Sequence, residues 1–587
     1  MDNVGKPIDE EYLAKDYQPL NNIEDVEEFY AAIDRKNLTR KLSPERPYTY
    51  WTLELYDQAN GIRGGGGLGI LAADTRRTAE RMNVPLTLIT PFYPSEAHQL
   101  YRNGETIDEH KPVNYNDYGF TFIDTIAIKC NNEFVTLDVI EKKFGATRII
   151  SVTEKNFGEL YSGDSNGDHR LYQQVALGFG GYQALKLVGL KPAIMQLNEV
   201  ATFFAALARL DELASSGMDL YEALVYTRKH TLYTNHTLVQ AAEANFTYDQ
   251  FERYVFPNLK SPAVEKWIFD RFKNGHIRLS DVTIEVAEMR NGVSKLHARV
   301  ANYHDIAGKR VKFKAITNGI DMPYWISPEI IDFYQEKGIL DKFYLPLNNY
   351  KAKIEDISAA EVREMKRLGR AKLNKILARR PNQNGDFIQV PDDALVFTFK
   401  RRFVSYKRPW LPFTNPEKLR DLLEKYNGYY FLSGRVHSGD VEMSKRLNEL
   451  LEIIKNDEIL SRRVHYLPDY DEVLARSLSK GANIVINTPI VGLEACGTSW
   501  MKDIGNLDLL ISTHDGGVAD GPTDAYLNIT GKTEESEARE LYHRMEEAAE
   551  AWNNDFDLEY WLHHELSAYL PVISGTRMLK DYLNYLF

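Results

Sequence analysis

The hydrophobic pattern of this 587-residue chain alternates short apolar runs with amphipathic segments. Between residues 48 and 192, apolar runs such as "YTYWTLELY" and "VPLTLITPFY" predict strands, whereas "LAADTRRTAERM" has helical spacing. "AIMQLNEV" then predicts a strand that leads into the helix "ATFFAALARLDELASS". Strands that alternate with helices in this way indicate parallel sheets covered by helices on both faces.

A second alternating region begins after a highly charged helical stretch, residues 351–386, which ends in a Pro/Asn/Gly-rich segment typical of a domain boundary. The predicted strands beyond it are "ALVFTF", "GYYFLSG", "RRVHYLP", "ANIVINTP" and "LDLLIST". This half is therefore predicted to be a doubly wound sheet. The final "GTRMLKDYLNYLF" is an amphipathic helix that we expect to return to the first domain.

These patterns predict an α/β protein with two Rossmann-like, doubly wound domains that face a central cleft, the usual place for a ligand. The expected divisions are an N-terminal α/β domain (1–350), a charged helical linker (351–386), a C-terminal domain (387–565) and a C-terminal helix (566–587).

Composition and charge narrow the function. Hydrophobic residues make up 43% and charged residues 26%, which is ordinary globular composition. The formal net charge of −13 argues against a nucleic-acid partner, although it leaves room for a local basic pocket. Cys130 and Cys496 are the only cysteines, and the chain contains no apolar leader and no run of 18 apolar residues. We therefore expect a cytoplasmic protein with no membrane partner.

The first candidate site is the glycine-rich stretch "GIRGGGGLGILAAD", in which Gly64, Gly66 and Gly69 match a dinucleotide-binding motif. The ribose-binding acid expected about twenty residues later is missing, and no Lys-Ser/Thr pair follows the glycines. What remains is a glycine loop that opens a helix, where backbone N–H groups attract an anion. The alternative is a flexible linker.

The second candidate is "FKRRFVSYKRPW", which places Arg401, Arg402, Lys407 and Arg408 just after a predicted strand. Ligands of open α/β sheets bind at this carboxyl edge. Guanidinium groups and a lysine suit a phosphate dianion. A solvated basic surface is the alternative.

The third candidate is residues 494–502, "EACGTSWMK", read as a small-residue turn that ends in Lys502. Backbone N–H groups and two hydroxyls in this turn could hold a phosphate, and the lysine could hold an aldehyde cofactor as a Schiff base. A surface turn with a solvated lysine is the alternative. Asn235, His236 and His297, taken singly, are typical of hydrogen-bonded structural groups.

Taken together and in order, these segments resemble the α-glucan phosphorylases, the pyridoxal-phosphate family that includes the glycogen and maltodextrin phosphorylases. The segments are "GGLGILAAD", "MQLNE", "YTNHT", "NGVSKLHARV", "ITNGI", "RRFVSYKRP", "LPDYDEVLA", "EACGTSWMK" and "STHDGG". The resemblance is to the compact bacterial and archaeal branch, and it implies a GT-B-type glycosyltransferase architecture. It also implies a pyridoxal 5′-phosphate cofactor, and an α-glucan and inorganic phosphate as substrates. The product would be α-glucose 1-phosphate, released with retention of configuration, and the family suggests a homodimer.

The resemblance also assigns roles to individual residues. The catalytic residues would be Arg402, Lys407 and His297, the first two binding the substrate phosphate. Lys502 would carry the cofactor as a Schiff base, with Thr498, Ser499 and Tyr470 around it. Substrate would contact Gly66, Gly67 and Leu68 in the glycine loop, and Asn318, Glu494, Cys496 and Gly497 around the glucosyl unit.

Several positions depart from the family pattern. Ala201 stands where the family has a histidine, and Val404 and Ser405 replace a polar pair. Trp500 replaces a Gly or Asn and could narrow the cofactor pocket, and "DIGNLD" stands where the family has an Asn-Gly dipeptide. Two other functions therefore stay open: a nucleotide-sugar-dependent glycosyltransferase without pyridoxal phosphate, and a catalytically altered glucan-binding relative.

Overall fold

The computed structural model describes residues 42–587 except 103, 161–166, 238–243, 302, 304–309 and 438. The described residues group into two units by their contacts. Unit 1 contains residues 97–109 and 318–577, and unit 2 contains residues 42–96, 110–317 and 578–587. The predicted linker, residues 351–386, contains helices α14 and α15, which lie in unit 1.

In the described part of unit 1, six parallel strands form a sheet in the order β18-β17-β16-β19-β20-β21. The strands are β16 Leu395–Lys400, β17 Gly428–Ser433, β18 Val464–Tyr466, β19 Ile484–Asn487, β20 Leu509–Thr513 and β21 Leu527–Ile529. Chain order reverses between β16 and β19, so the carboxyl ends of these two neighbours form a topological switch point, where open α/β sheets bind ligands.

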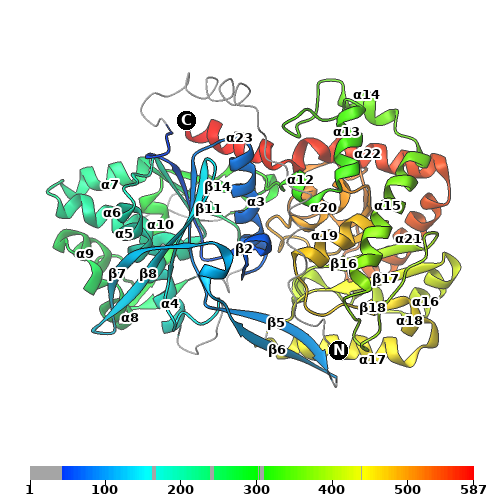
Figure 1. Ribbon diagram of the computed structural model, residues 1–587, viewed down its shortest axis with the longest axis horizontal. Coiled ribbons are helices and arrows are strands. Elements are labelled where there is room, and N and C mark those ends of the chain that lie inside the picture. The colour runs from blue at the N-terminus through cyan, green and yellow to red at the C-terminus, as the bar shows by residue number, and fades with distance from the viewer. Residues whose placement is uncertain are drawn as a thin grey trace. The chain divides into compact units, whose positions relative to one another are not determined.

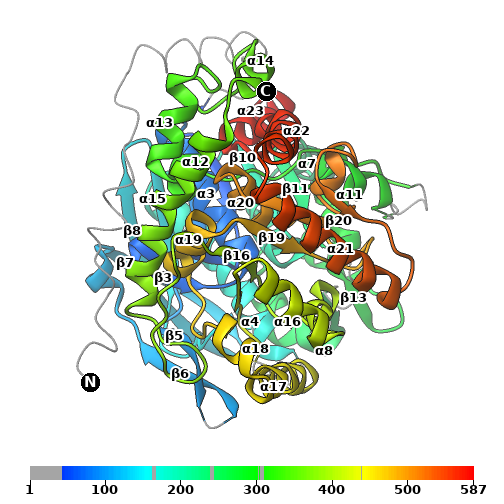
Figure 2. The same ribbon diagram turned by 90° about the vertical axis from the view of Figure 1, so that its right-hand side faces the viewer.

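Unit 1 also contains the following described helices (Figure 2). They are α12 Met322–Trp325, α13 Pro328–Glu336, α14 Tyr350–Glu355, α15 Ala359–Leu377, α16 Pro416–Lys425, α17 Val441–Asn456, α18 Glu458–Arg463, α19 Glu472–Gly481, α20 Ser499–Gly505, α21 Glu534–Trp552 and α22 Asp555–Ile573. A Cβ on Gly369 of α15 would lie 1.9 Å from the Lys480 carbonyl oxygen of α19. Only glycine permits this crossing of α15 and α19.

In the described part of unit 2, nine strands form a sheet in the order β15-β14-β11-β10-β1-β4-β9-β8-β7. The strands are β1 Tyr48–Trp51, β4 Leu86–Pro91, β7 Thr121–Cys130, β8 Glu133–Phe144, β9 Thr147–Thr153, β10 Ile194–Asn198, β11 Thr231–Asn235, β14 Met289–Gly292 and β15 Lys314–Ala315. All pairings from β15 to β9 are parallel. Here chain order reverses between β1 and β10, which gives this sheet a switch point of its own.

Further short strands and helices complete the two units. The strands are β2 Leu55–Asp57, β3 Ile62–Gly64, β5 Ser95–Arg102, β6 Glu105–Pro112, β12 Asn245–Thr247 and β13 His276–Arg278. The helices of unit 2 are α3 Gly67–Arg81, α4 Asp168–Val175, α5 Gly181–Leu187, α6 Phe203–Ser215, α7 Leu220–Lys229, α8 Tyr248–Tyr254, α9 Pro262–Phe269, α10 Leu279–Val286 and α11 Lys295–Val300.

Three hairpins, one of them the antiparallel pair of β2 and β3, interrupt the alternation that the sequence predicts between residues 48 and 192. Strand β5 pairs with β6, and β7 pairs with β8 in an antiparallel extension of the sheet. Asn131 and Asn132 join β7 to β8 with φ values of 53° and 63°. Asparagine tolerates this left-handed conformation, which suits the twist of a two-residue hairpin turn.

The amphipathic helix predicted at the C-terminus is confirmed as α23, Gly575–Leu586 (Figure 1). Its apolar face, which includes Met578, Leu579, Tyr582 and Leu583, is buried in one core with residues of α3, β1 and β4. Asn291 of β14 donates a hydrogen bond to the Tyr582 hydroxyl at 3.0 Å. The last turns of the chain are thus part of the core of unit 2.

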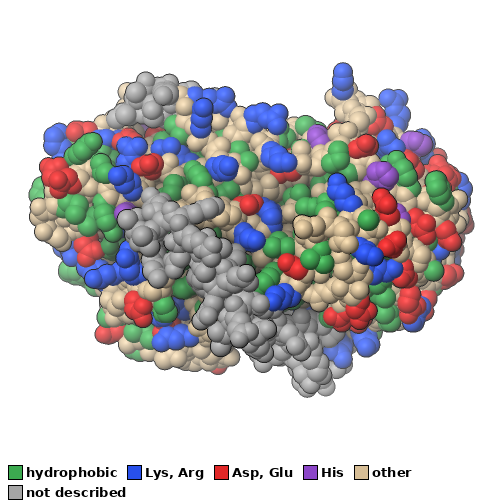
Figure 3. Space-filling view, turned by 90° about the horizontal axis from the view of Figure 1, so that it is seen from above, with side chains coloured by type: hydrophobic (Ala, Val, Ile, Leu, Met, Phe, Trp, Pro, Cys, Tyr) green, Lys and Arg blue, Asp and Glu red, His purple; other side chains and the backbone are tan. Residues whose placement is uncertain are grey.

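The expected mixed α/β class, with two sheets rich in parallel strands, is confirmed. The central cleft and the four-part domain division stay predictions. None of the helices in the described ranges is long and apolar enough to cross a membrane. On the face seen in Figure 3, acidic and basic side chains are interspersed.

Candidate functional site

A charge cluster lies at the switch point of unit 1. Arg401 follows β16, and its guanidinium donates hydrogen bonds to Asn487 Oδ1, at the end of β19, and to Glu494 Oε2 at 2.6 Å. Lys407 Nζ lies 3.4 Å from Glu494 Oε1. One buried carboxylate is therefore held by two buried cations at the edge where a ligand is expected.

The electrostatics of this cluster favour an anion. Burial and the neighbouring Arg401 lower the pKa of Lys407 to about 7, although Glu494 partly offsets them. Burial would raise the pKa of Glu494, but Arg401 and Lys407 lower it to about 2. Arg402 adds positive charge close to Lys407. Two cationic side chains thus contact one carboxylate and a third adds charge near Lys407, and the excess positive charge suits a phosphate.

The structure distinguishes the four basic residues of this segment. Arg402, which the sequence analysis assigns to phosphate, is exposed, and Arg401 is the buried guanidinium that contacts Glu494. Arg408 is buried elsewhere and bonds the Thr488 and Pro489 carbonyl oxygens. From the sequence, Arg401 is named only as a member of the basic cluster and receives no role of its own, although it directly follows a buried strand.

Gly497 allows the cluster to close. A Cβ at this position would lie 2.4 Å from Arg401 Nη2 and 3.0 Å from Glu494 Oε1. The neighbouring Cys496 is buried, and its carbonyl oxygen accepts a hydrogen bond from Asn318 Nδ2 at 3.2 Å. Asn318 Oδ1 is buried with no hydrogen-bond partner among the described residues. An acceptor of this kind suits a ligand hydroxyl.

Lys502 lies on a short helix, α20, and not in the turn that the sequence analysis expects. The segment "SWMKDI" contains no glycine or proline, so the helix continues until Gly505. Lys502 is 4% exposed, and its Nζ lies 3.3 Å from the centre of the Trp325 ring. Thr498 and Ser499 are half-buried where the helix begins. The solvated-lysine alternative is therefore wrong.

Tyr470, the remaining residue assigned to the cofactor, lies close to this helix. Its hydroxyl donates a hydrogen bond to the carbonyl oxygen of Lys400, the last residue of β16, at 3.1 Å. Burial raises the pKa of Tyr470, and the charge of Asp503 on α20 adds to that effect. The phenol therefore stays protonated and can donate a hydrogen bond.

Asn506 ties the segment that carries Lys502 to the segment that carries Trp325. Its Nδ2 donates to the Lys502 carbonyl oxygen at 2.8 Å and to the Trp325 carbonyl oxygen at 3.1 Å. Its Oδ1 accepts from the Ser327 N–H at 2.8 Å. We call this set of bonds the Asn506 clamp. All of its members are buried, so it fixes the backbone beneath the lysine and the ring.

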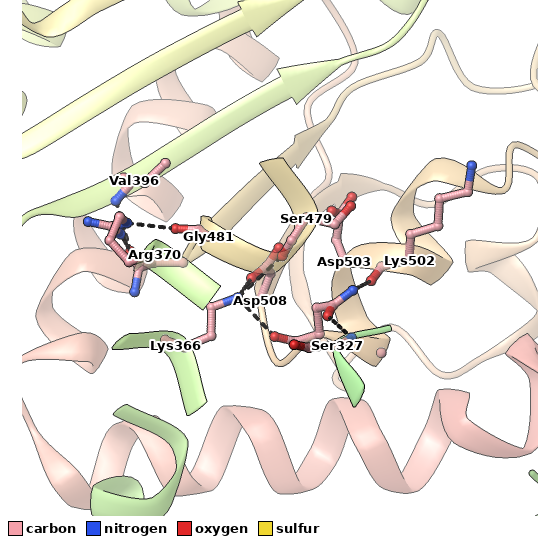
Figure 4. Close-up of polar contacts among 12 residues, drawn as sticks. Ser327, Lys366, Arg370, Val396, Ser479, Gly481, Lys502, Asp503 and Asp508 are labelled. Carbon is pink, nitrogen blue, oxygen red and sulfur yellow. Dashed lines mark hydrogen bonds and ion pairs between the residues drawn. The ribbon is translucent and has the colours of Figure 1, made fainter. Parts of the chain in front are cut away.

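Buried ion pairs support the same helix. Lys400 contacts Asp503, the residue after Lys502, and Lys366 contacts Asp508. In Figure 4 the Lys502 side chain extends away from the Lys366–Asp508 pair. Asp503 and Asp508 thus pair with Lys400 and Lys366, and the Lys502 amine lies over the Trp325 ring.

Trp500 does not occupy the position that the sequence analysis expects. Its ring is 1% exposed and packs edge-on against Tyr569 of α22, with ring centres 5.0 Å apart. A Cβ on Gly517 would lie 3.2 Å from the Trp500 ring. The indole therefore fills the core of unit 1, and the expected narrowing of the cofactor pocket has no support in its position.

A second polar group lies at the carboxyl edge of unit 2. Asn198 ends β10, and Glu199 follows with φ of 75°, which is strained for a residue with a side chain. Glu199 Oε1 accepts hydrogen bonds from the His236 N–H at 2.5 Å and from Thr237 Oγ1 at 3.0 Å. Burial lowers the pKa of His236 to about 3, so this ring is neutral near pH 7.

The two histidines of this edge differ in exposure. His297 is fully buried, and its ring nitrogens contact Asn235 Oδ1 at 2.7 Å and the Val293 N–H at 3.3 Å. His236 is half-buried and contacts Asn198. Because both nitrogens of His297 have protein partners, His236 is better placed to meet a ligand. The sequence analysis named His236 only as a structural group.

The glycine loop joins β3 to α3 and is anchored by an acid. Glu54 Oε2 accepts a hydrogen bond from the Gly66 N–H at 2.7 Å. Gly67 begins α3, and a Cβ at this position would have open space around it. Leu68 is half-buried. The Gly66 N–H is thus engaged by a buried carboxylate, whereas Gly67 faces open space.

Comparison with known proteins identifies the family to which this chain belongs. The model of the carbohydrate phosphorylase family matches residues 193–567, more than half of the chain. This chain belongs to the carbohydrate phosphorylase family. The matched region contains both polar edges described above, from Asn198 of unit 2 to Lys502 of unit 1.

Individual relatives are distant but cover most of the chain. A maltodextrin phosphorylase of Thermococcus litoralis is 24% identical over 92% of this chain and 70% of its own length. A glycogen phosphorylase of Aquifex aeolicus is 25% identical over 88% of this chain and 83% of its own length. An uncharacterized protein of Methanocaldococcus jannaschii is 25% identical over 92% of this chain and its own full length.

Replacing Gly497 with alanine tests the charge cluster. The added methyl group would push the Arg401 guanidinium away from Glu494, so we expect the free energy of unfolding to fall by about 1–3 kcal/mol. Urea unfolding measures this change. Gly439→Ala is the matched control, because its Cβ would meet its nearest neighbour at 3.4 Å, an ordinary contact. Equal losses in the two variants would contradict the steric argument.

Replacing Asn506 with alanine tests the Asn506 clamp. The Trp325 carbonyl oxygen and the Ser327 N–H would lose this partner, whereas the Lys502 carbonyl oxygen would keep its bond from the Asn506 backbone N–H, so we expect the free energy of unfolding to fall by about 2–4 kcal/mol. Asn553→Ala, at an exposed position after α21, should change it by less than about 0.5 kcal/mol. Wild-type stability of Asn506→Ala in urea would show that the clamp does not hold these segments.

Proposed function

We propose that this protein is a pyridoxal-phosphate-dependent phosphorylase with a GT-B-type architecture. It would transfer glucosyl units from an α-1,4-glucan to inorganic phosphate and release α-glucose 1-phosphate with retention. The observation that carries this proposal is the Arg401–Glu494–Lys407 cluster at the switch point of unit 1. Its carboxylate, Glu494, lies eight residues before the buried Lys502 in the sequence. Family membership and the names of the two characterized relatives support the same substrates.

The residues of unit 1 fit the cofactor. A buried primary amine against an aromatic ring, as at Lys502 and Trp325, is the group that an aldehyde cofactor requires. Hydroxyls for its phosphate would come from Thr498 and Ser499, and Arg401 would supply charge. Tyr470, whose hydroxyl donates to the Lys400 carbonyl oxygen, would lie nearby. When bound, pyridoxal phosphate supplies a phosphate group whose second pKa near 6 allows proton exchange near neutral pH.

The chain's own side chains would manage charge in the reaction. The substrate phosphate dianion would be held by Arg401, Arg402 and Lys407. Their positive charge would offset the repulsion between this dianion and the phosphate group of the cofactor. The substrate phosphate gives its proton to the glycosidic oxygen as that bond to C1 breaks. One of its oxygens then bonds to C1 from the same face, which leaves a free 4-hydroxyl on the shortened glucan and the phosphate ester on glucose.

The sugar would be held by uncharged and anionic acceptors. The low pKa of Glu494 keeps it ionised, so its oxygens can accept hydrogen bonds from glucosyl hydroxyls. Asn318 Oδ1 offers a further buried acceptor. We include His236 with His297 among the candidates for sugar contact. The roles of Gly66, Gly67, Leu68 and Cys496 stay predictions.

The direct test is to incubate the protein with maltodextrin, phosphate and pyridoxal phosphate and to measure glucose 1-phosphate. We expect turnover in the wild type and in Lys455→Ala, an exposed control on α17, and none in Lys502→Ala. After borohydride reduction, mass spectrometry should locate the cofactor on Lys502. No glucose 1-phosphate and no labelled Lys502 would overturn the proposal, and binding of a nucleoside diphosphate glucose instead would favour the glycosyltransferase alternative.

The pKa of Lys407 generates a linkage prediction. Above pH 7 the buried amine is largely neutral, and a bound dianion favours its charged form, so anion binding should take up a proton. At pH 8 we expect an uptake of about 0.5–1 proton per sulfate bound, measured by calorimetry in buffers of different ionisation enthalpy. Sulfate is the probe because it does not titrate in this range.

The matched variants for this linkage are Lys407→Met and Lys455→Met. The first should bind sulfate more weakly and without proton uptake, whereas the second should behave as the wild type. In the wild type, affinity should fall as the pH rises above about 7, because protonating Lys407 then costs free energy. Uptake that persists in Lys407→Met would assign the proton to another group.

A further inference from the structure

Three exposed aliphatic side chains directly precede Glu494. Ile490 is 40% exposed, Val491 54% and Leu493 37%. Large apolar side chains gathered beside buried charged groups often mark a binding surface, whereas single ones do not. We call these three side chains the apolar rim.

The backbone of the apolar rim is fixed to the segments that carry the charge cluster. The Ile490 N–H donates to the Tyr406 carbonyl oxygen at 2.7 Å, next to Lys407 in sequence. The Leu493 N–H donates to the Ile490 carbonyl oxygen at 3.1 Å. The Glu494 N–H donates to Asp515 Oδ2 at 2.9 Å, which fixes the end of the loop.

Two further features hold the loop. Arg408 donates hydrogen bonds to the carbonyl oxygens of Thr488 at 2.9 Å and Pro489 at 3.2 Å, just before the rim. Gly492 takes φ of 91°, a conformation that a side chain would strain, and so turns the chain between Val491 and Leu493. The apolar rim therefore lies on a fixed backbone that leads directly into Glu494 of the charge cluster.

The chemistry of this surface points to its occupant. The aliphatic groups offer no partner for a charge, and the adjacent cations repel cationic ligands. A ligand that extends from the Glu494 carboxylate across the apolar rim must place a hydroxyl at the carboxylate. It must also place C–H groups against the aliphatic side chains of the rim. A pyranose chain has both, since its rings carry hydroxyls at the edge and C–H groups on their faces.

We propose that Ile490, Val491 and Leu493 contact the C–H faces of the α-glucan chain beside the glucosyl unit held at Glu494, and so set the affinity for glucan. This inference rests on the proposed function and adds specificity-determining residues to it. Removing the aliphatic groups should weaken glucan binding by about tenfold, the effect of roughly 1–2 kcal/mol of lost apolar burial. Binding of phosphate at Lys407 should not change.

The experiment compares the wild type with the triple variant Ile490→Ser, Val491→Ser, Leu493→Ser. Calorimetry with maltoheptaose gives a dissociation constant without turnover, and initial rates give KM for maltoheptaose and for phosphate. We expect the dissociation constant and the KM for maltoheptaose to rise about tenfold, with the KM for phosphate within twofold. Val441→Ser is the matched control, because Val441 is an aliphatic side chain of the same unit that is 78% exposed.

The outcomes separate the two levels of the proposal. An active wild type whose glucan affinity survives the triple variant would overturn the apolar rim and leave the proposed function standing. A wild type that neither binds nor cleaves glucan would overturn the proposed function. A triple variant that changes oligomeric state in size-exclusion chromatography, with glucan affinity intact, would show that the rim contacts a second copy. Because all three residues are exposed, the melting temperature should stay unchanged.

Discussion

The pairing of Glu494 with Arg401 and Lys407 is the interaction on which the rest of the candidate site depends. A buried carboxylate is costly unless charged partners and hydrogen bonds compensate it, and removing one partner leaves the other uncompensated. Strand order brings these residues together, because Arg401 directly follows β16 and Asn487 ends the neighbouring strand β19, where chain order reverses. Gly497 then leaves room for the guanidinium, so one small residue decides whether the cluster closes.

Behind this cluster, a buried polar layer fixes the helix that carries Lys502. Burial raises the pKa of Asp508 and lowers that of Lys366, so the pair is held at the expense of desolvation. Lys400 and Asp503, which are the sequence neighbours of Arg401 and Lys502, form a second buried ion pair. Such pairs are weak evidence for stability, but they specify one arrangement, because any other would leave a buried charge unpaired. The position of Lys502 relative to β16 is thereby determined.

Sequence reasoning found five of the six described strands of the unit 1 sheet, because each is a continuous apolar run that can be read locally. In the unit 2 sheet it found β1, β4 and β10. It missed the β7–β8 hairpin, where Asn131 and Asn132 were the available signal, and it expected a turn at Lys502. It gave Arg402 a role and Arg401 none, because the bonds that bury Arg401, to Asn487 and Glu494, come from distant segments. Bonds between distant segments, such as those of Asn506 to Trp325 and Ser327, depend on the tertiary fold and leave no trace in spacing.

The sheets of unit 1 and unit 2 each have a switch point at the carboxyl ends of their parallel strands. The side chains at these two edges differ in charge, which suits them to different ligands. The edge of unit 1 carries an excess of cations, whereas in unit 2 Glu54 and Glu199 accept backbone N–H groups beside a neutral His236. A phosphate dianion would be attracted to the first edge and repelled by these carboxylates. Carboxylates, amides and a neutral imidazole instead suit hydroxyls. The two edges therefore offer different chemistry at the ends of parallel strands.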